Sequence, residues 1–171
     1  MTHQLALELQ FARQKWFEGH ADLTDEDARK RLGHANSMGW MIGHLAWFEQ
    51  LAWVEGCQEK TVSAYVQRFN WSTPASTPPL KKVLSEWHLV TAAADEFLNE
   101  MQEKDLATML YRRQRPLENV GTMLRRQIWH YWYHLGEMQA IRQMLGHTNL
   151  PAYIGQMGQM NATVAYSATG S

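Results

Sequence analysis

The stretch Met123-Leu-Arg-Arg-Gln-Ile-Trp-His130-Tyr-Trp-Tyr-His134-Leu-Gly-Glu137-Met-Gln-Ala-Ile-Arg-Gln-Met-Leu145 is a long helical pattern that carries two histidines one turn apart. At 100° per residue, its main apolar stripe also contains His130, His134 and Glu137. In a helical protein this stripe faces the interior. An inward face with two imidazoles and a carboxylate indicates either a functional site or an unusual core.

Three other stretches place apolar residues at helical spacing. They predict helices over residues 2–18, 37–55 and 78–102, and Gly19 and Gly56 are expected to end the first two. The stretch quoted above is the fourth long helix, capped by Thr122 and ended by Gly146. A short polar helix is expected between Thr24 and Gly33. No segment is predicted as a strand, so the expected fold is an all-α four-helix bundle.

A long crossover is predicted between helices 2 and 3. Residues 62–69 suggest two helical turns, and residues 72–79 form a polar connector rich in Ser, Thr and Pro. A connection of this length allows the two helices to run in the same direction. Between helices 3 and 4, a short helical turn is expected at 105–110, followed by a basic run.

A chain of 171 residues with 45% hydrophobic residues is sufficient for one domain with a proper core. The domain is expected over residues 1–160, followed by a loosely ordered tail at 161–171. The net charge of −1 argues against general attraction to nucleic acid or acidic lipid. Charged and polar residues interrupt the apolar run at 38–54, so no membrane span is expected.

The location is expected to be cytoplasmic. The first residues lack the basic and apolar regions of a signal peptide, and the single cysteine, Cys57, fits a reducing compartment. Cys57 has no neighbouring base in the sequence, so a nucleophilic role is not expected.

His44 lies in the middle of the apolar stripe of helix 37–55. Bundles build metal sites from inward side chains of facing helices, so His44, His130 and His134 could form a three-nitrogen set. Three protein ligands leave a coordination position for water or substrate, as in catalytic zinc sites. On spacing alone, an equally good alternative is that each histidine is a hydrogen-bonded core residue.

Glu137 points with the two histidines of helix 4, and no Lys or Arg lies three or four residues away to pair with it. It could orient an imidazole, ligate weakly or accept a proton. The alternative is that it reaches solvent. Gly136 beside it costs about 1 kcal/mol relative to Ala in a helix, which suggests a close helix approach.

Several further side chains are candidates of lower rank. Expected pocket walls are Trp40, Trp47, Phe48 and Trp132, with Trp40 and Phe48 the better placed. His3, His20, His34 and His147 are expected to be surface residues, and His88 lies off the main inner stripe of its helix. A basic cluster of Arg112, Arg113, Arg115, Arg125 and Arg126 is either a solvated charge run or a dock for an anionic cofactor or substrate.

Two segments resemble the signature helices of the DinB-like superfamily: Ser37-Met-Gly-Trp-Met-Ile-Gly-His44-Leu-Ala-Trp-Phe-Glu49 and His130-Tyr-Trp-Tyr-His134-Leu-Gly-Glu137. Members are four-helix bundles, commonly dimeric, whose three motif histidines bind zinc, nickel or, in a related branch, iron. The resemblance therefore implies a divalent metal on His44, His130 and His134. Where the family often has Gly-Gln, this chain has Gly136-Glu137, which adds a negative charge near the site.

The resemblance implies a metal-dependent enzyme that transfers a low-molecular-weight thiol to or from a small-molecule substrate, or a related isomerase or hydrolase. Glu137 would be its catalytic base or would orient one of the metal-binding histidines without contacting the metal. The protein would be a homodimer. The alternative is a non-catalytic helical binding or dimerisation module without metal-dependent activity. A nucleic-acid partner is not expected, because the sequence lacks a strongly basic balance.

Overall fold

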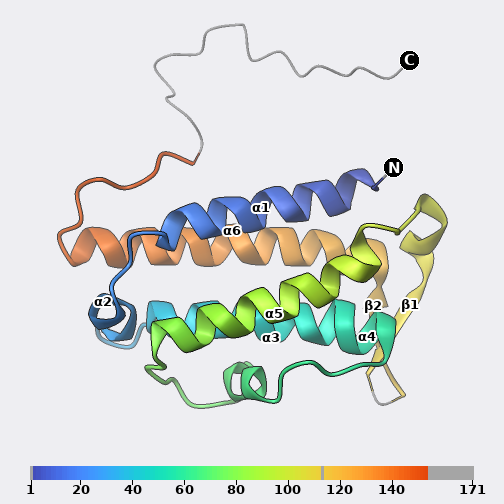
Figure 1. The fold of residues 1–171 in the computed structure, drawn as a ribbon, viewed down its shortest axis with the longest axis horizontal. Coiled ribbons are helices and arrows are strands. Elements are labelled where there is room, and N and C mark those ends of the chain that lie inside the picture. The colour runs from blue at the N-terminus through green and yellow to red at the C-terminus, as the bar shows by residue number, and fades with distance from the viewer. Residues whose placement is uncertain (1, 113, 154–171) are drawn as a thin grey trace, which may run out of the picture.

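The computed structural model describes residues 2–112 and 114–153, and four long helices make up about half of this part of the chain. These are α1 (Gln4–His20), α3 (Met38–Glu49), α5 (Leu80–Leu98) and α6 (Val120–Met144). Helix α1 lies along α6, and α3 lies along α5, so two helix pairs form a bundle (Figure 1). The predicted four-helix bundle is confirmed.

Helices α3 and α5 run in the same direction, as the long crossover predicts (Figure 1). The helical path of α3 continues through a π-helical turn, Gln50–Glu55, and the short helix α4 (Gly56–Gln58). The prediction that Gly56 ends this helix is therefore wrong. The Gln58 amide donates to the carbonyl oxygens of Trp53 (2.9 Å), in the π-helical turn, and Ala93 (2.8 Å), on α5, so the continued helix end is bonded to its neighbour in the bundle.

The crossover is fixed to the π-helical turn by the buried amide of Gln50. Its oxygen accepts hydrogen bonds from the backbone N–H groups of Val62 (3.2 Å) and Ser63 (2.8 Å), and its nitrogen donates to the carbonyl of Ser63 (2.9 Å). The crossover then forms a 3-10 helix, Tyr65–Phe69, within the segment where two helical turns are predicted.

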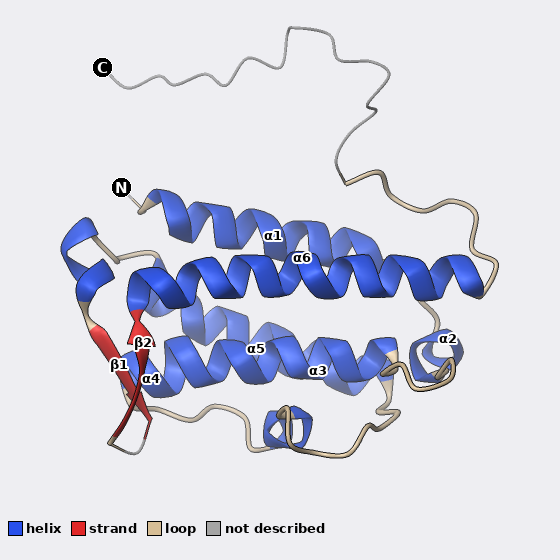
Figure 2. Cartoon of the chain, turned by 180° about the vertical axis from the view of Figure 1, so that it is seen from behind, coloured by secondary structure: helices blue, strands red, loops and turns tan. Residues whose placement is uncertain are grey.

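A β-hairpin connects α5 to α6, against the prediction that no segment is a strand (Figure 2). A 3-10 helix, Glu103–Ala107, precedes strands β1 (Met109–Arg112) and β2 (Arg115–Asn119), which pair antiparallel. The helical turn expected at 105–110 therefore stops before β1. The strands have four and five residues, and only Leu110 of β1 is buried, so their alternation is too short for a sequence pattern to detect.

The helix boundaries differ from the predicted ones where a different residue provides the cap. Helix α1 begins after His3, whose ring nitrogen accepts from Leu5 N (3.1 Å), and α6 begins after Asn119, whose side chain accepts from Thr122 N (2.8 Å). Helix α2 (Asp25–Arg29) lies beside the start of α5, and Asp25 accepts from Leu80 N at 2.7 Å.

Gly19 lies inside α1 rather than after its end. A Cβ atom there would lie 2.9 Å from a methyl carbon of Leu135 on α6, so the glycine permits close packing of the two helices. Gly146 does follow the end of α6 with a φ of +87°, as predicted.

The last described residues pack on the bundle. The carbonyl of Pro151 accepts from the Gln139 side chain (3.0 Å), and Tyr153 contacts the hydrophobic core. Residues 154–171, which include the predicted domain end at 160 and the tail at 161–171, lie outside the described residues.

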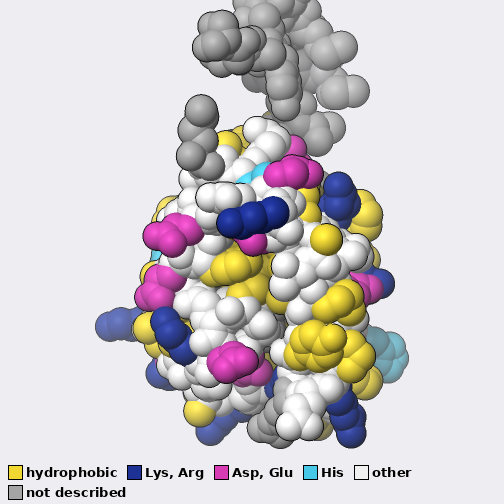
Figure 3. Space-filling view, turned by 90° about the vertical axis from the view of Figure 1, so that its right-hand side faces the viewer, with side chains coloured by type: hydrophobic (Ala, Val, Ile, Leu, Met, Phe, Trp, Pro, Cys, Tyr) yellow, Lys and Arg dark blue, Asp and Glu magenta, His cyan; other side chains and the backbone are white. Residues whose placement is uncertain are grey.

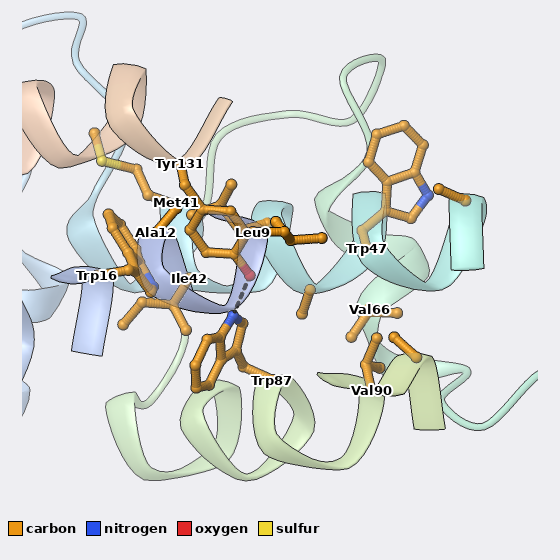
Figure 4. Packing of buried hydrophobic residues seen from close by; sticks show 14 of the residues in the cluster. Leu9, Ala12, Trp16, Met41, Ile42, Trp47, Val66, Trp87, Val90 and Tyr131 are labelled. Atoms are coloured by element: carbon orange, nitrogen blue, oxygen red, sulfur yellow. Dashed lines mark hydrogen bonds between the residues drawn. The ribbon is translucent and has the colours of Figure 1, made fainter. Parts of the chain in front are cut away.

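A buried polar network joins the four long helices. Arg13 of α1 donates to both carboxylate oxygens of Glu49 on α3, at 2.7 and 2.6 Å. The hydroxyl of Tyr131 on α6 donates to Glu49 (2.9 Å) and accepts from the indole N–H of Trp87 on α5 (2.8 Å), as Figure 4 shows for the latter pair. Arg13 also pairs with Asp95 on α5 at 2.5 Å. Since each side chain of this network has a hydrogen-bond partner on another helix, the network fixes the positions of the four helices relative to one another.

On the end of the molecule that carries the start of α1 and the hairpin, acidic and basic side chains are interspersed, with hydrophobic groups exposed between them (Figure 3). Within the described part of the chain, every helix is too short or too polar to cross a lipid bilayer.

Candidate metal centre

Three histidines converge between α3 and α6. His44 projects from α3, and His130 and His134 project from successive turns of α6. One ring nitrogen of each lies within 4.8 Å of the other two. The sequence therefore identified all three members of this cluster, because each lies on the inward stripe of its helix.

The ring of His44 is held by the crossover and by two tryptophans. Its Nδ1 donates to the backbone carbonyl of Phe69 at 2.7 Å, since a carbonyl oxygen can only accept. Trp40 stacks on the imidazole with ring centres 4.5 Å apart, and Trp47 stacks with centres 5.5 Å apart. In the neutral imidazole, this arrangement leaves the lone pair on Nε2.

Gly43 allows the crossover to reach His44. A Cβ atom at this position would lie 2.5 Å from a ring carbon of Phe69, so any larger residue would displace the segment whose carbonyl holds the imidazole.

The imidazole of His134 is oriented by Glu137. The carboxylate accepts from His134 Nδ1 at 2.6 Å, which places the lone pair of the neutral ring on Nε2. This Nε2 lies 2.9 Å from Nε2 of His130. Of the roles that the sequence leaves open for Glu137, the contact it makes is that of orienting a histidine, from the side of the ring that faces away from His130.

Burial favours the neutral imidazole at two of the three histidines, His44 and His130. Burial lowers the pKa of His44 to about 4, and burial together with the charges of His134 and His44 lowers the pKa of His130 to about 3. The hydrogen bond from His134 lowers the pKa of Glu137, so this side chain is a carboxylate at neutral pH. Neutral imidazole is the form that binds transition metals.

A pocket of about 390 Å³ opens beside the cluster. It is lined by His44, Trp47, Phe48, Leu51, Trp71, Arg126, Trp129 and His130. Trp71 comes from the crossover and is 81% exposed, and Trp129 comes from α6 and is 64% exposed. The two histidines therefore lie at the wall of a mainly aromatic pocket.

Two of the four predicted pocket walls, Trp47 and Phe48, line this pocket, and the other two do not. Trp40 lies against His44 instead, and Trp132 faces α1, where its ring centre lies 6.3 Å from that of Phe11. Trp132 is two residues from His130, which turns it about 200° around the helix. The sequence missed Trp71, because its irregular segment has no periodic pattern, and Trp129, which lies off the inward stripe.

The basic cluster separates in the structure. Arg112 contacts Glu55 (3.2 Å) and Arg125 donates to the carbonyl of Gly121 (3.1 Å), whereas Arg126 lines the pocket. Arg113 lies outside the described residues. Arg115 is exposed.

The prediction that His20 is a surface residue is wrong. It is 2% exposed, because α1 continues beyond its predicted end and carries His20 against Trp16 and Trp87. His34 is exposed as predicted, while His3 and His147 are partly buried. Burial raises the pKa of the Cys57 thiol to about 12, which makes it a poor nucleophile.

Comparisons with known proteins agree with this geometry. The sequence model of a family described as the DinB superfamily matches residues 8–138. The crystal structure of a DinB-like protein from Bacillus cereus ATCC 10987 is similar, with a TM-score of 0.62, 20% identity, and coverage of 86% of this chain and 93% of that one. At this identity the likeness concerns the fold alone. No curated protein matches the chain.

Proposed function

Because this chain belongs to the DinB superfamily and three imidazoles converge beside a pocket, we propose that it holds a divalent transition metal on His44, His130 and His134. The observation that carries the proposal is the orientation of the rings. Phe69 and Glu137 occupy Nδ1 of two of the histidines, so each neutral ring presents an Nε2 lone pair.

The donor set fits such an ion. Lone pairs on the Nε2 atoms of His130 and His134, 2.9 Å apart, repel one another unless a proton or a cation lies between them. A proton there would sit on His130 Nε2 and leave a lone pair on its Nδ1, which is buried and has no described protein partner. A cation removes the repulsion between the two Nε2 atoms, since each ring then contributes one nitrogen to it, and Nδ1 of His130 has no described partner in either case.

We further propose that the protein is an enzyme acting on a small molecule, with transfer of a low-molecular-weight thiol as the reaction that the family resemblance implies. A divalent ion held by three protein ligands supplies Lewis acidity and lowers the pKa of a coordinated water or thiol. The protein's contribution is to keep His44 and His130 neutral, to hold the rings of His44 and His134, and to exclude water with Trp47 and Phe48. Glu137 acts here as a positioning residue for His134.

Calorimetric titration of the chelator-treated protein with zinc and nickel tests the metal site. We expect one ion per chain for the wild type. His134→Ala should weaken binding at least 100-fold and leave the helical circular dichroism unchanged. His34→Ala, which removes an exposed histidine, is the matched control and should bind like the wild type. Wild-type affinity in His134→Ala would overturn the assignment.

The activity is tested by incubating zinc-, nickel- and iron-loaded protein with common cellular thiols and an electrophilic acceptor, and measuring loss of free thiol. Turnover above the rate with His134→Ala supports an enzyme. Stoichiometric metal without turnover contradicts the proposed reaction. Substoichiometric metal after loading with all three ions favours a non-catalytic helical module instead.

A further inference from the structure

Within the described part of the chain, Arg126 is the one Lys or Arg side chain that lines the pocket beside the histidines. It lies four residues before His130 on α6, so the two positions are about 6 Å apart along the helix axis. The other lining residues are His44, His130 and five apolar side chains. Among the residues that the structure describes, no acidic side chain lines the pocket, and Arg126 is the group there that can recognise an anion.

This guanidinium is held in place and still has donors to offer. Among the described residues, Arg126 pairs with Glu118 of β2, through one nitrogen, at 2.7 Å. Since an arginine carries five N–H donors, others remain for a second acceptor. A planar guanidinium suits carboxylate, sulfonate or phosphate groups, which accept two parallel hydrogen bonds.

The apolar lining of the pocket includes two tryptophans that lie largely exposed at the surface of the bundle. Trp71 and Trp129 are 81% and 64% exposed, although burial of a tryptophan is strongly favourable. They flank the pocket from the crossover and from α6, while Trp47 forms a more buried wall. Such exposed aromatic groups at a pocket mouth are typical of a surface that contacts an apolar ligand.

We propose that this pocket selects small molecules with an apolar or aromatic body and one anionic group, and that Arg126 is the residue that recognises the anion. The body lies against Trp47, Trp71 and Trp129, and the other end of the molecule reaches His44 and His130. This last point rests on the proposed metal function, whereas the charge selectivity of the pocket does not.

Two fluorescent probes of matched shape separate these contributions. The anionic probe is 8-anilinonaphthalene-1-sulfonate, and its neutral counterpart is N-phenyl-1-naphthylamine, which lacks the sulfonate. Both are titrated into wild-type protein and variants, with and without zinc. Arg126→Gln should weaken binding of the anionic probe about 10-fold, because it removes a charged hydrogen-bond donor, and should change the neutral probe less than 2-fold.

The controls come from the same helix. Arg125→Gln removes the neighbouring exposed arginine, which does not line the pocket, and should leave both affinities unchanged. Trp129→Ala should weaken both probes at least 3-fold. The proposal is overturned if Arg126→Gln leaves the anionic probe unaffected, weakens both probes equally, or has the same effect as Arg125→Gln. It is also overturned if Trp129→Ala leaves both probes unaffected.

The two proposals fail in different ways. Zinc uptake is measured separately by calorimetry, so an absence of zinc binding contradicts the metal site even when the probes show charge selectivity. Loss of charge selectivity with normal zinc uptake contradicts only the role of Arg126.

Discussion

Gly43 and Gly136 each lie next to a residue of the candidate centre, but their surroundings are opposite. At Gly43 an added Cβ would meet the Phe69 ring at 2.5 Å, whereas at Gly136 no described atom lies within 4 Å of the Cβ position. The close helix approach that the sequence suggested for Gly136 is therefore absent from the described structure. The glycine that allows a close approach is Gly43, where the crossover meets α3.

Gly43→Ala should destabilise the protein by about 1–3 kcal/mol, because Phe69 must move out of a packed position. The displaced Phe69 carbonyl should also release His44, so zinc affinity should fall. Urea denaturation of the metal-free protein and calorimetric zinc titration measure the two effects. A variant with wild-type stability and affinity would show that the contact with Phe69 is not needed.

Gly136→Ala should stabilise the protein by about 0.5–1 kcal/mol, because alanine has the higher helix propensity and an exposed position offers it space. The same urea denaturation measures this change. It serves as the counterpart of Gly43→Ala, since both variants add one methyl group beside the site. A loss of stability would mean that Gly136 packs against another chain, which leaves no space for the added methyl group.

Glu137→Gln should lower zinc affinity about 10-fold while leaving the fold unchanged. The amide oxygen can still accept from His134 Nδ1, but a neutral acceptor raises the basicity of the imidazole less than a carboxylate does. Glu137→Ala removes the acceptor altogether and should lower the affinity further, towards 100-fold. Equal zinc affinities in the wild type and both variants would show that Glu137 does not contribute to zinc binding.

At the scale of elements, periodic sequence patterns predicted the four long helices but did not predict the irregular segments. Helices α1, α5 and α6 bury one face, and α3 is buried nearly all round, so each carries apolar residues at helical spacing, which is the signal that a sequence can carry. The hairpin β1–β2 is a local pairing, but strands of four and five residues are too short to give a periodic signal. The π-helical turn Gln50–Glu55 is bonded to a later segment, through the contacts of the Gln50 amide with residues 62–63. No local pattern encodes such pairings.

The buried ion pair between Arg13 and Glu49 is the contact that joins α1 to α3 most directly. Glu49 is 0% exposed and Arg13 is 5% exposed, so removing one partner leaves a buried charge without its main counterion. Glu49→Gln should therefore destabilise the protein by about 3 kcal/mol in urea denaturation. The matched control, Glu8→Gln on the exposed face of α1, should change stability by less than about 0.5 kcal/mol. A loss below 1 kcal/mol for Glu49→Gln would contradict this role.

At the scale of the whole molecule, the sequence located the three histidines but not the pocket beside them. The histidines lie on predicted helix faces, whereas Trp71 reaches the pocket from the crossover and Trp129 from outside the inward stripe. A pocket is formed by elements that meet only in the folded chain. The residues that line it are therefore harder to predict from the sequence than the three histidines. A homodimer and a cytoplasmic location remain expectations from the sequence.

The free energy of unfolding should depend on pH through His20. Burial, with further lowering by the charges of His88 on α5 and Arg142 on α6, brings the pKa of His20 from 6.5 to about 4. As the pH falls from about 6.5 to about 4, the unfolded chain binds a proton that the folded protein excludes, so stability falls. The loss attributable to His20 should reach about 3 kcal/mol and cease below pH 4, where both states are protonated.

His20→Phe isolates this contribution, because phenylalanine fills a similar volume among Trp16, Phe17 and Trp87 and cannot titrate. Urea denaturation at pH 7, 5.5 and 4 should show the wild type losing about 3 kcal/mol more than the variant over this range. Other histidines titrate in both proteins, so they cancel in the comparison. Parallel pH profiles for the two proteins would show that His20 is protonated equally in the folded and unfolded states, and hence that the end of α1 admits water.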